Sequence, residues 1–231
     1  MRKRSKGRRR WLRRIALTAV IVTVLSVGGW FGVVPRYRPN LHVGERFGID
    51  VSNHQGSIDW KAVRGDGVTF AYLKATEGST FTDPTFAANW AGAAVAGVTR
   101  GAYHFFTLCT PGIEQAQHFL SVARPDATSL APAVDLEFAG NCTGRPPGAD
   151  VRRELRAFTD AVEQATGRTL VLYVGRDFQD AYGINVDRPR WTPRWFRRPS
   201  NAWVIWQSSG HGRVAGVRGF VDLDVAHGAL P

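Results

Sequence analysis

Four carboxylate side chains lie within or at the ends of short apolar segments that are typical of β-strands. Asp50 belongs to FGIDV, Asp135 and Glu137 to AVDLEF, and Asp222 to FVDLD. Because successive strand side chains point to opposite faces, Asp135 and Glu137 share one face, about 6.5–7 Å apart along it. Two buried carboxyl groups at this spacing repel each other, which raises one pKa and keeps that group protonated near neutral pH. A proton donor beside a carboxylate is the pair that cleavage of a glycosidic bond requires.

Each of these acids, taken alone, is explained as a strand-end residue that accepts a hydrogen bond from a neighbouring loop amide. Four of them together favour a shared site, because the active sites of α/β barrels lie at the carboxyl ends of the strands. Asp224 lies two residues after Asp222 and shares its face of the last apolar segment. The carboxylates therefore predict a hydrolase that works with acid and base side chains.

Aromatic and basic side chains in the same segments are candidates for a sugar-binding groove. Tyr103, Tyr173 and Trp206 lie in predicted strands, where an aromatic ring lines a carbohydrate groove or packs in the core. Lys74, in LKATEG, either balances the charge of the acid cluster or lies at the surface of a strand end. His104 is interpreted as a core histidine.

Other catalytic chemistries lack their characteristic motifs. The six histidines show no H-E-x-x-H or other ligand spacing, and there is no C-x-x-C. The nucleophile motif G-x-S-x-G and the phosphate-binding Walker glycines are also absent from the sequence. We therefore expect hydrolysis without a metal ion or cofactor.

The first 34 residues have the pattern of a membrane anchor. Residues 1–14 carry nine Lys and Arg and no acid, and residues 15–34 form an uncharged apolar stretch. About 20 apolar residues suffice to cross a bilayer as a helix, and flanking cations stay in the cytoplasm. The pattern predicts a single-pass membrane protein with residues 35–46 as a linker and the remainder outside the cytoplasm. The alternatives are a secretory signal that is cleaved and, less favoured, a buried core helix.

The formal charge of +11 does not indicate a nucleic-acid partner. Without the cations of residues 1–14, Arg36 and Arg38, residues 40–231 hold 19 basic and 19 acidic side chains. A neutral domain needs no basic face, and a cationic tail beside a membrane span is suited to anionic lipid headgroups. We expect a monomer that contacts the membrane and does not bind nucleic acid.

Short apolar strands alternate with helical stretches after the linker. The predicted strands are 47–51, 68–75, 100–106, 131–138, 169–174, 202–207 and 219–225, and the predicted helices are 84–98, 113–123 and 149–167. This alternation is typical of a parallel α/β sheet. The lack of a convincing helix between the last strands favours a barrel with an irregular final part over an open doubly wound sheet.

The chain has two cysteines, Cys109 and Cys142, each a few residues beyond a predicted strand. An exported chain with an even cysteine number is expected to form a disulfide, which here would join two neighbouring loops. The alternative is a pair of free thiols.

At these residues the sequence resembles the glycoside hydrolase family 25 muramidases, the Chalaropsis-type lysozymes. The resemblance covers nearly all of residues 47–231, which we take as the catalytic domain. It rests on GIDVSNHQGSIDW, FAYLKATEGSTFTDPTF, GVTRGAYHFF, APAVDLEF, LVLYVG and VIWQSSGHGRVAGVRGFVDLD, in the family's order. The resemblance implies an α/β fold: a modified (β/α) barrel of the TIM type with eight strands and missing late helices.

The resemblance also implies roles for individual residues. Glu137 matches the family's general acid/base, and Asp135 matches its partner, acting as the nucleophile or as the group that orients the substrate's acetamido group. Asp50 and Asp222 match the acids that complete the set. The implied activity is cleavage, with retention, of the β-1,4 bond between N-acetylmuramic acid and N-acetylglucosamine in peptidoglycan. The substrate-contacting residues expected in these motifs are Tyr103, Tyr173, Trp206, Lys74 and Glu77.

Three departures from the family pattern affect details of substrate binding. Ser208 stands where the family often has tyrosine, Asp224 stands where it usually has asparagine, and residues 191–198 lack the usual aromatic pattern. An alternative function is a membrane-tethered module that binds peptidoglycan without cleaving it. The intact D-x-E pair favours the enzyme.

Overall fold

A computed structural model describes residues 3–123, 126 and 128–228 of the chain. These residues divide into two compact units, of which the first ends at Arg38 and the second begins at Pro39. The first unit contains the helix α1 (Lys3–Gly32) and a short 3-10 helix, η1 (Val34–Arg36). The segment Gly7–Arg36 is long and apolar enough to cross a membrane, a property that a signal sequence near the N-terminus shares.

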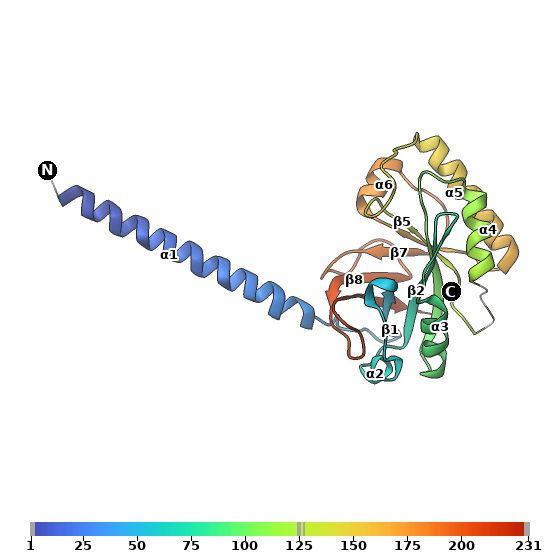
Figure 1. Ribbon diagram of the computed structural model, residues 1–231, viewed down its shortest axis with the longest axis horizontal. Coiled ribbons are helices and arrows are strands. Elements are labelled where there is room, and N and C mark those ends of the chain that lie inside the picture. The colour runs from blue at the N-terminus through green and yellow to red at the C-terminus, as the bar shows by residue number, and fades with distance from the viewer. Residues whose placement is uncertain (1–2, 124–125, 127, 229–231) are drawn as a thin grey trace. The chain divides into compact units, whose positions relative to one another are not determined.

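Nine strands of the second unit form one closed sheet (Figure 1). They are β1 (Glu45–Val51), β2 (Phe70–Glu77), β3 (Phe81–Thr82), β4 (Thr99–Phe105), β5 (Ala133–Leu136), β6 (Val171–Val174), β7 (Arg190–Pro193), β8 (Ile205–Gly212) and β9 (Val221–His227). Strand β1 pairs with both β2 and β9, and this double pairing closes the barrel. The two-residue strand β3 only extends β2 as a hairpin, so the barrel itself has eight strands.

The barrel is parallel except at β9. Neighbouring strands run parallel from β1 through β2, β4, β5, β6 and β7 to β8. Strand β9 runs antiparallel to both of its neighbours, β8 and β1. This mixed closure follows from the short connection after β8, because a parallel return requires a crossover of a dozen or more residues.

Helices cover the outside of the early part of the barrel. They are α2 (Trp60–Gly65), α3 (Phe86–Val95), α4 (Gly112–Val122), α5 (Gly148–Thr166) and α6 (Arg176–Tyr182). The short 3-10 helix η2 (Asn53–Gln55) directly follows β1. Figure 1 shows α4 and α5 packed side by side on the sheet. No helix connects β7 to β8 or β8 to β9, all of whose residues the structure describes, so the predicted barrel with missing late helices is confirmed.

The helix α5 follows from its sequence. Val151, Leu155, Phe158 and Val162 recur at helical spacing and are all buried. The helix ends at Gly167, whose left-handed backbone (φ 67°) is the conformation that glycine adopts most readily.

The interior of the barrel is filled by aromatic side chains that glycines accommodate. Phe70 and Tyr72 point inward from β2 and are fully buried. A Cβ atom at Gly48 would lie 2.3 Å from the Phe70 ring, and one at Gly101 would lie 2.5 Å from the Tyr72 ring. The two glycines therefore leave the space that these rings occupy, and the packed interior supports the rim above it.

Candidate functional site

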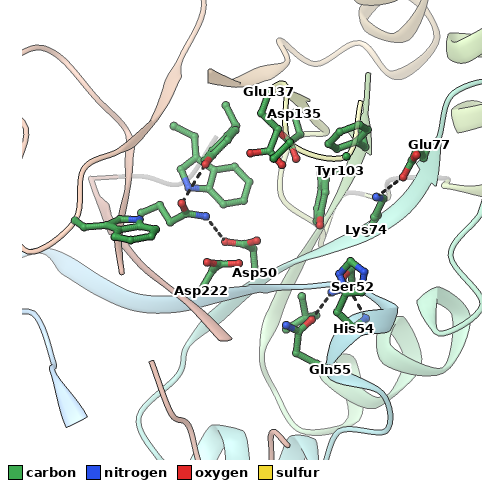
Figure 2. A pocket seen from close by; sticks show the side chains of 18 residues that line it. Asp50, Ser52, His54, Gln55, Lys74, Glu77, Tyr103, Asp135, Glu137 and Asp222 are labelled. Atoms are coloured by element: carbon green, nitrogen blue, oxygen red, sulfur yellow. Dashed lines mark hydrogen bonds and ion pairs between the residues drawn. The ribbon is translucent and has the colours of Figure 1, made fainter. Parts of the chain in front are cut away.

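A cavity of about 450 Å³ opens at the carboxyl ends of the parallel strands (Figure 2). The last residues of β1 and β2 reach it through Asp50, Val51 and Glu77, and β5 reaches it through Asp135. Parallel strands end at the same rim of a barrel, so side chains that are distant in the sequence meet there.

The predicted site residues converge on this cavity with one exception. The lining includes Asp50, Lys74, Glu77, Tyr103, Asp135, Glu137, Tyr173 and Asp222. Figure 2 shows Asp50 and Asp222 together at one side, and Asp135 and Glu137 together at another.

Trp206 is the exception, and its expected place in the groove does not agree with the structure. In β8 the side chain of Gln207 lines the cavity. Trp206 precedes it and therefore points to the opposite face, where its indole donates a hydrogen bond to the carbonyl of Arg194 at 2.7 Å. Its ring packs against Trp203 and the guanidinium of Arg198. The two-residue period of the strand explains the difference.

Asp135 and Glu137 form one wall of the cavity. Strand β5 ends at Leu136, so Asp135 lies on the strand and Glu137 directly follows it. Val134 and Leu136 take the opposite face and are fully buried. This alternation places the two acids above the cavity and their apolar neighbours beneath the helices.

Burial is the largest cause of the raised pKa values in this wall. It raises the pKa of Glu137 from 4.5 to about 6 and that of Asp135 well above its usual range. The second cause for Asp135 is the charge of Glu137, whereas the second cause for Glu137 is the charge of Asp177. The sequence predicted burial and the D-x-E pair as causes of the raised pKa, and the contribution of Asp177 was not predicted. Lys74 acts in the opposite sense on both acids.

Asp50 and Asp222 form a second carboxylate pair. They are direct partners across the antiparallel strands β1 and β9, so their side chains lie on the same face. The amide of Gln207 donates a hydrogen bond to Oδ2 of Asp50 at 3.1 Å, and the Tyr173 hydroxyl donates to Oε1 of Gln207 at 3.1 Å. Burial, followed by neighbouring carboxylates, raises the pKa of both Asp50 and Asp222.

Lys74 places a positive charge beside the carboxylates. Its ammonium forms an ion pair with Glu77 at 2.6 Å and lies 4.5 Å from the centre of the Phe105 ring. Only 9% of the Lys74 residue is exposed. Lys74 is therefore buried beside the acids and does not lie at the surface of a strand end.

The loop after β5 is held by a disulfide and by one asparagine. Cys109 and Cys142 are bonded, which confirms the predicted bridge between the loops after β4 and β5. Between them, the Asn141 amide donates to the carbonyls of Phe106 and Glu137 at 2.8 and 3.0 Å. Its Oδ1 accepts from the amides of Leu108 and Cys142. Asn141 thus ties the backbone of Glu137 to the neighbouring loop.

Some residues that were not predicted from the sequence also line the cavity. Ser52, His54 and Gln55 follow β1 in a short turn, in which Ser52 and Gln55 form a capping box. Trp195 follows β7 and is 45% exposed. The signal for the first three was their place directly after Asp50 in GIDVSNHQG. Trp195 lies in the segment that was noted as divergent.

In the described part of the chain, no group of three or more His, Cys, Asp or Glu is arranged so that it could hold a metal ion. The cavity instead combines buried carboxyl groups of raised pKa with tyrosines, a lysine and an exposed tryptophan. Such an arrangement can hold a proton near neutral pH and transfer it to a bound sugar.

Comparison with known proteins agrees with this chemistry. Residues 49–217 match the family model described as glycosyl hydrolases family 25. Lysozyme M1 of Streptomyces globisporus is 34% identical over 200 residues, covering 79% of this chain and 68% of that protein. A family 25 glycosyl hydrolase from Bacillus anthracis superposes with a TM-score of 0.75 at 30% identity, covering 84% of this chain and 94% of that structure. A lysozyme structure from Streptomyces coelicolor gives a TM-score of 0.73 at 33% identity, with 81% and 94% covered.

Proposed function

We propose that this chain, a muramidase that belongs to glycosyl hydrolases family 25, cleaves peptidoglycan with Glu137 as general acid and base. The scissile bond is the β-1,4 bond between N-acetylmuramic acid and N-acetylglucosamine. The observation that carries the proposal is the wall formed by Asp135 and Glu137, in which the pKa of Glu137 rises to about 6. A carboxylic acid with this pKa is protonated often enough near neutral pH to act as a donor.

Glu137 acts twice in the proposed reaction. It first gives its proton to the glycosidic oxygen, which leaves as the hydroxyl of the departing sugar. As a carboxylate it then removes a proton from water, whose oxygen attacks the anomeric carbon. The proton that Glu137 donated is thereby restored, and the enzyme returns to its starting state.

Asp135 assists at the anomeric carbon by one of two routes. It attacks the carbon and forms a covalent glycosyl intermediate, or it orients the substrate's own 2-acetamido group, whose oxygen attacks. Its Oδ1 is buried without a hydrogen-bond partner among the described residues, so it can accept a bond from a substrate N–H or attack the anomeric carbon. In both routes the anomeric carbon undergoes two successive displacements, first of the departing sugar and then, by water, of the attacking oxygen, and configuration is retained.

The remaining lining residues position the glycan. Asp50 and Asp222 complete the carboxylate set opposite the Asp135–Glu137 wall, while Tyr103 offers an aromatic surface for a sugar ring. Tyr173, Lys74 and Glu77 supply hydrogen-bonding groups at the cavity wall. No cofactor takes part in the scheme.

The test is the release of muropeptides from purified cell wall by the full chain in detergent. Glu137→Gln should abolish release, whereas Asp150→Asn, an exposed carboxylate on α5, should leave it unchanged. Mass spectrometry identifies the reducing-end sugar, and NMR of the first-formed anomer distinguishes retention from inversion. Binding to wall without release by the unaltered chain would instead support the non-catalytic module.

We further propose that α1 anchors the enzyme in the cell membrane and that the barrel lies outside the cytoplasm. The span Gly7–Arg36 and the cationic residues at its start support this orientation. The linker enters the barrel near Asn40 and Glu45, both held by Arg198, at the end of β1 that lies away from the cavity. An intact mass in the membrane fraction is expected, and loss of about 35 residues would show a cleaved signal instead.

A further inference from the structure

Asp224 is a carboxyl group buried inside the barrel, below the cavity. It lies on β9, where it pairs with Gly48 of β1, two positions from the pair formed by Asp222 and Asp50. The residue is 0% exposed. The two-residue spacing directs Asp224 to the same face as Asp222 and so toward Asp50.

Only one oxygen of Asp224 has a hydrogen-bond donor. Oδ1 accepts a bond from the indole Nε1 of Trp191 at 2.9 Å. Oδ2 is buried and accepts no hydrogen bond from an N–H or hydroxyl group of the described residues. When an ionised carboxylate is fully buried and one of its oxygens accepts no hydrogen bond, the lost hydration costs roughly several kcal/mol.

The group that Asp224 meets is another acid. The carboxyl groups of Asp50 and Asp224 lie within hydrogen-bonding reach of each other. Asp50 already accepts a bond from Gln207, as Asp224 does from Trp191, so each acid has one oxygen that is satisfied by a neutral donor. A hydrogen bond between the two carboxyl groups requires a proton on one of them.

We propose that Asp50 and Asp224 share one proton across this contact, and that Asp224 is a positioning residue that fixes Asp50 beneath the bound glycan. The inference rests on the proposed function, because it assigns the geometry of an acid in that same site. The shared proton removes one of two adjacent negative charges and gives Oδ2 of Asp224 a partner.

The surroundings of the pair favour retention of this proton. Asp222 of β9 adds a third carboxyl group within reach of Asp50, and its charge raises the pKa of Asp224. Tyr72 faces Asp224 from β2, and its own pKa is raised mainly by burial, so it remains a neutral phenol. Trp191 of β7 acts in the opposite sense, because its N–H donates to Asp224 and lowers the pKa of that acid. Burial raises the pKa of both members of the pair and is the largest cause for each.

More distant acids act on Asp50 in the same sense. The charge of Glu137, beyond the end of β5, raises the pKa of Asp50 across the cavity. Gln207 of β8 opposes this effect, because its amide donates to Asp50 and stabilises the ionised form. At high pH the pair therefore loses its proton, the two carboxylates repel, and Asp50 leaves its position.

The test is Asp224→Asn in the full chain. An asparagine accepts from Trp191 through its oxygen and donates to Asp50 through its amide, so it reproduces the protonated acid at every pH. We expect kcat/KM within about twofold of the unaltered chain in weak acid. On the alkaline side the unaltered enzyme should lose two protons that activity requires, whereas the variant should lose one. The ratio of kcat/KM of the variant to that of the unaltered enzyme should therefore grow by about tenfold per pH unit.

A second measurement reads the proton directly. The infrared difference spectrum at neutral pH should show the C=O band of one neutral carboxylic acid in the unaltered chain that Asp224→Asn lacks. Asp150→Asn, an exposed acid, should leave that band in place. An unchanged band, an unchanged alkaline limb or an inactive but folded Asp224→Asn would overturn the inference.

The Asp224→Leu variant separates a structural role from positioning. Leucine fills a similar volume without either hydrogen bond, so a folded variant should lose at least about tenfold in kcat while KM changes little. Full activity in that variant would contradict the inference. Failure of the unaltered chain to release muropeptides would refute the proposed function, whereas the infrared band still reports on the shared proton.

Discussion

Glu137 and Asp177 both lie against Gly175, and the charge of Asp177 is the largest electrostatic cause of the raised pKa of Glu137. A Cβ atom built on Gly175 would lie 3.2 Å from Cβ of Glu137 and 3.2 Å from Oδ1 of Asp177. The first turn of α6 therefore brings a second carboxylate to the proposed proton donor. A donor that is buried on one side and faces a negative charge on the other retains its proton toward neutral pH.

Removal of this charge should shift the pH dependence of the reaction. Asp177→Asn keeps the shape of the side chain but removes the charge, so the pKa of Glu137 should fall toward its ordinary value. The alkaline limb of kcat/KM should then move to lower pH, and the rate at pH 7 should drop about two- to fivefold. The measurement is a pH–rate profile on soluble glycan oligomers.

Asp180→Asn is the matched control for this experiment, because Asp180 is an exposed carboxylate on the same helix. Its pH profile should coincide with that of the unaltered enzyme. An alkaline limb that stays in place in Asp177→Asn would show that burial alone sets the pKa of Glu137.

The same raised pKa predicts a stability effect. The folded-state pKa of Glu137, about 6, lies above the ordinary 4.5, so the folded chain binds this proton more tightly. The resulting stabilisation is complete below pH 4.5 and is lost as the pH rises through 6. At about 1.4 kcal/mol per pKa unit, Glu137→Gln should unfold with a free energy about 2 kcal/mol higher than the unaltered chain at pH 7. Urea unfolding at pH 4 and pH 7 tests this, and an equal difference at both values would contradict it.

Strand period and motif order predicted eight of the residues that line the cavity. Asp50, Asp135 and Glu137 could be assigned to one rim because each falls where an apolar strand ends, and parallel strands end together. Trp206 was assigned to the wrong face of its strand. The aromatic residues around it did not indicate which alternate positions point into the cavity. Trp195 was missed, since its position depends on how the chain leaves β7.

The sequence predicted the helices and strands whose apolar periodicity is strong, and it failed to predict the short elements. Helix α5 has five buried positions at helical spacing. Strand β7 has four residues and includes Pro193, and α6 has seven residues, so neither gives a recognisable period. The neighbour of Glu137 that α6 supplies, Asp177, was therefore invisible in the sequence.

Asn141 should matter for both stability and catalysis. Asn141→Ala removes four hydrogen bonds and leaves the carbonyl of Glu137 without this donor. We expect a loss of about 2–4 kcal/mol in unfolding free energy and a fall in kcat that exceeds any change in KM. Asn141→Asp keeps the acceptor oxygen and should lose less. Unchanged kcat in a folded Asn141→Ala would show that the disulfide alone holds the loop.

The disulfide should stabilise the barrel by restricting the unfolded chain. Cys109 and Cys142 are 33 residues apart, and closing a loop of that length contributes about 3–4 kcal/mol in the chain-entropy account. The double variant Cys109→Ser, Cys142→Ser should unfold at correspondingly lower urea and keep activity at low temperature. Reduction of the unaltered chain should reproduce the shift, and a reductant should have no effect on the double variant.

Trp195 should contribute to substrate affinity more than to the chemical step. It lines the cavity, is 45% exposed, and its ring meets the edge of His211 at 5.3 Å, so its removal opens no core cavity. Loss of the exposed indole should cost about 1–2 kcal/mol of glycan binding, equivalent to about a five- to thirtyfold rise in KM for Trp195→Ala. Trp195→Phe retains an aromatic face and should recover most of this affinity, while kcat stays within about threefold in both. An unchanged KM with a lower kcat in Trp195→Ala would contradict this prediction and show that the indole acts on Asp222. The two side chains lie on either side of Gly210: a Cβ atom built there would be 3.0 Å from the Trp195 ring and 3.2 Å from the Asp222 carboxylate.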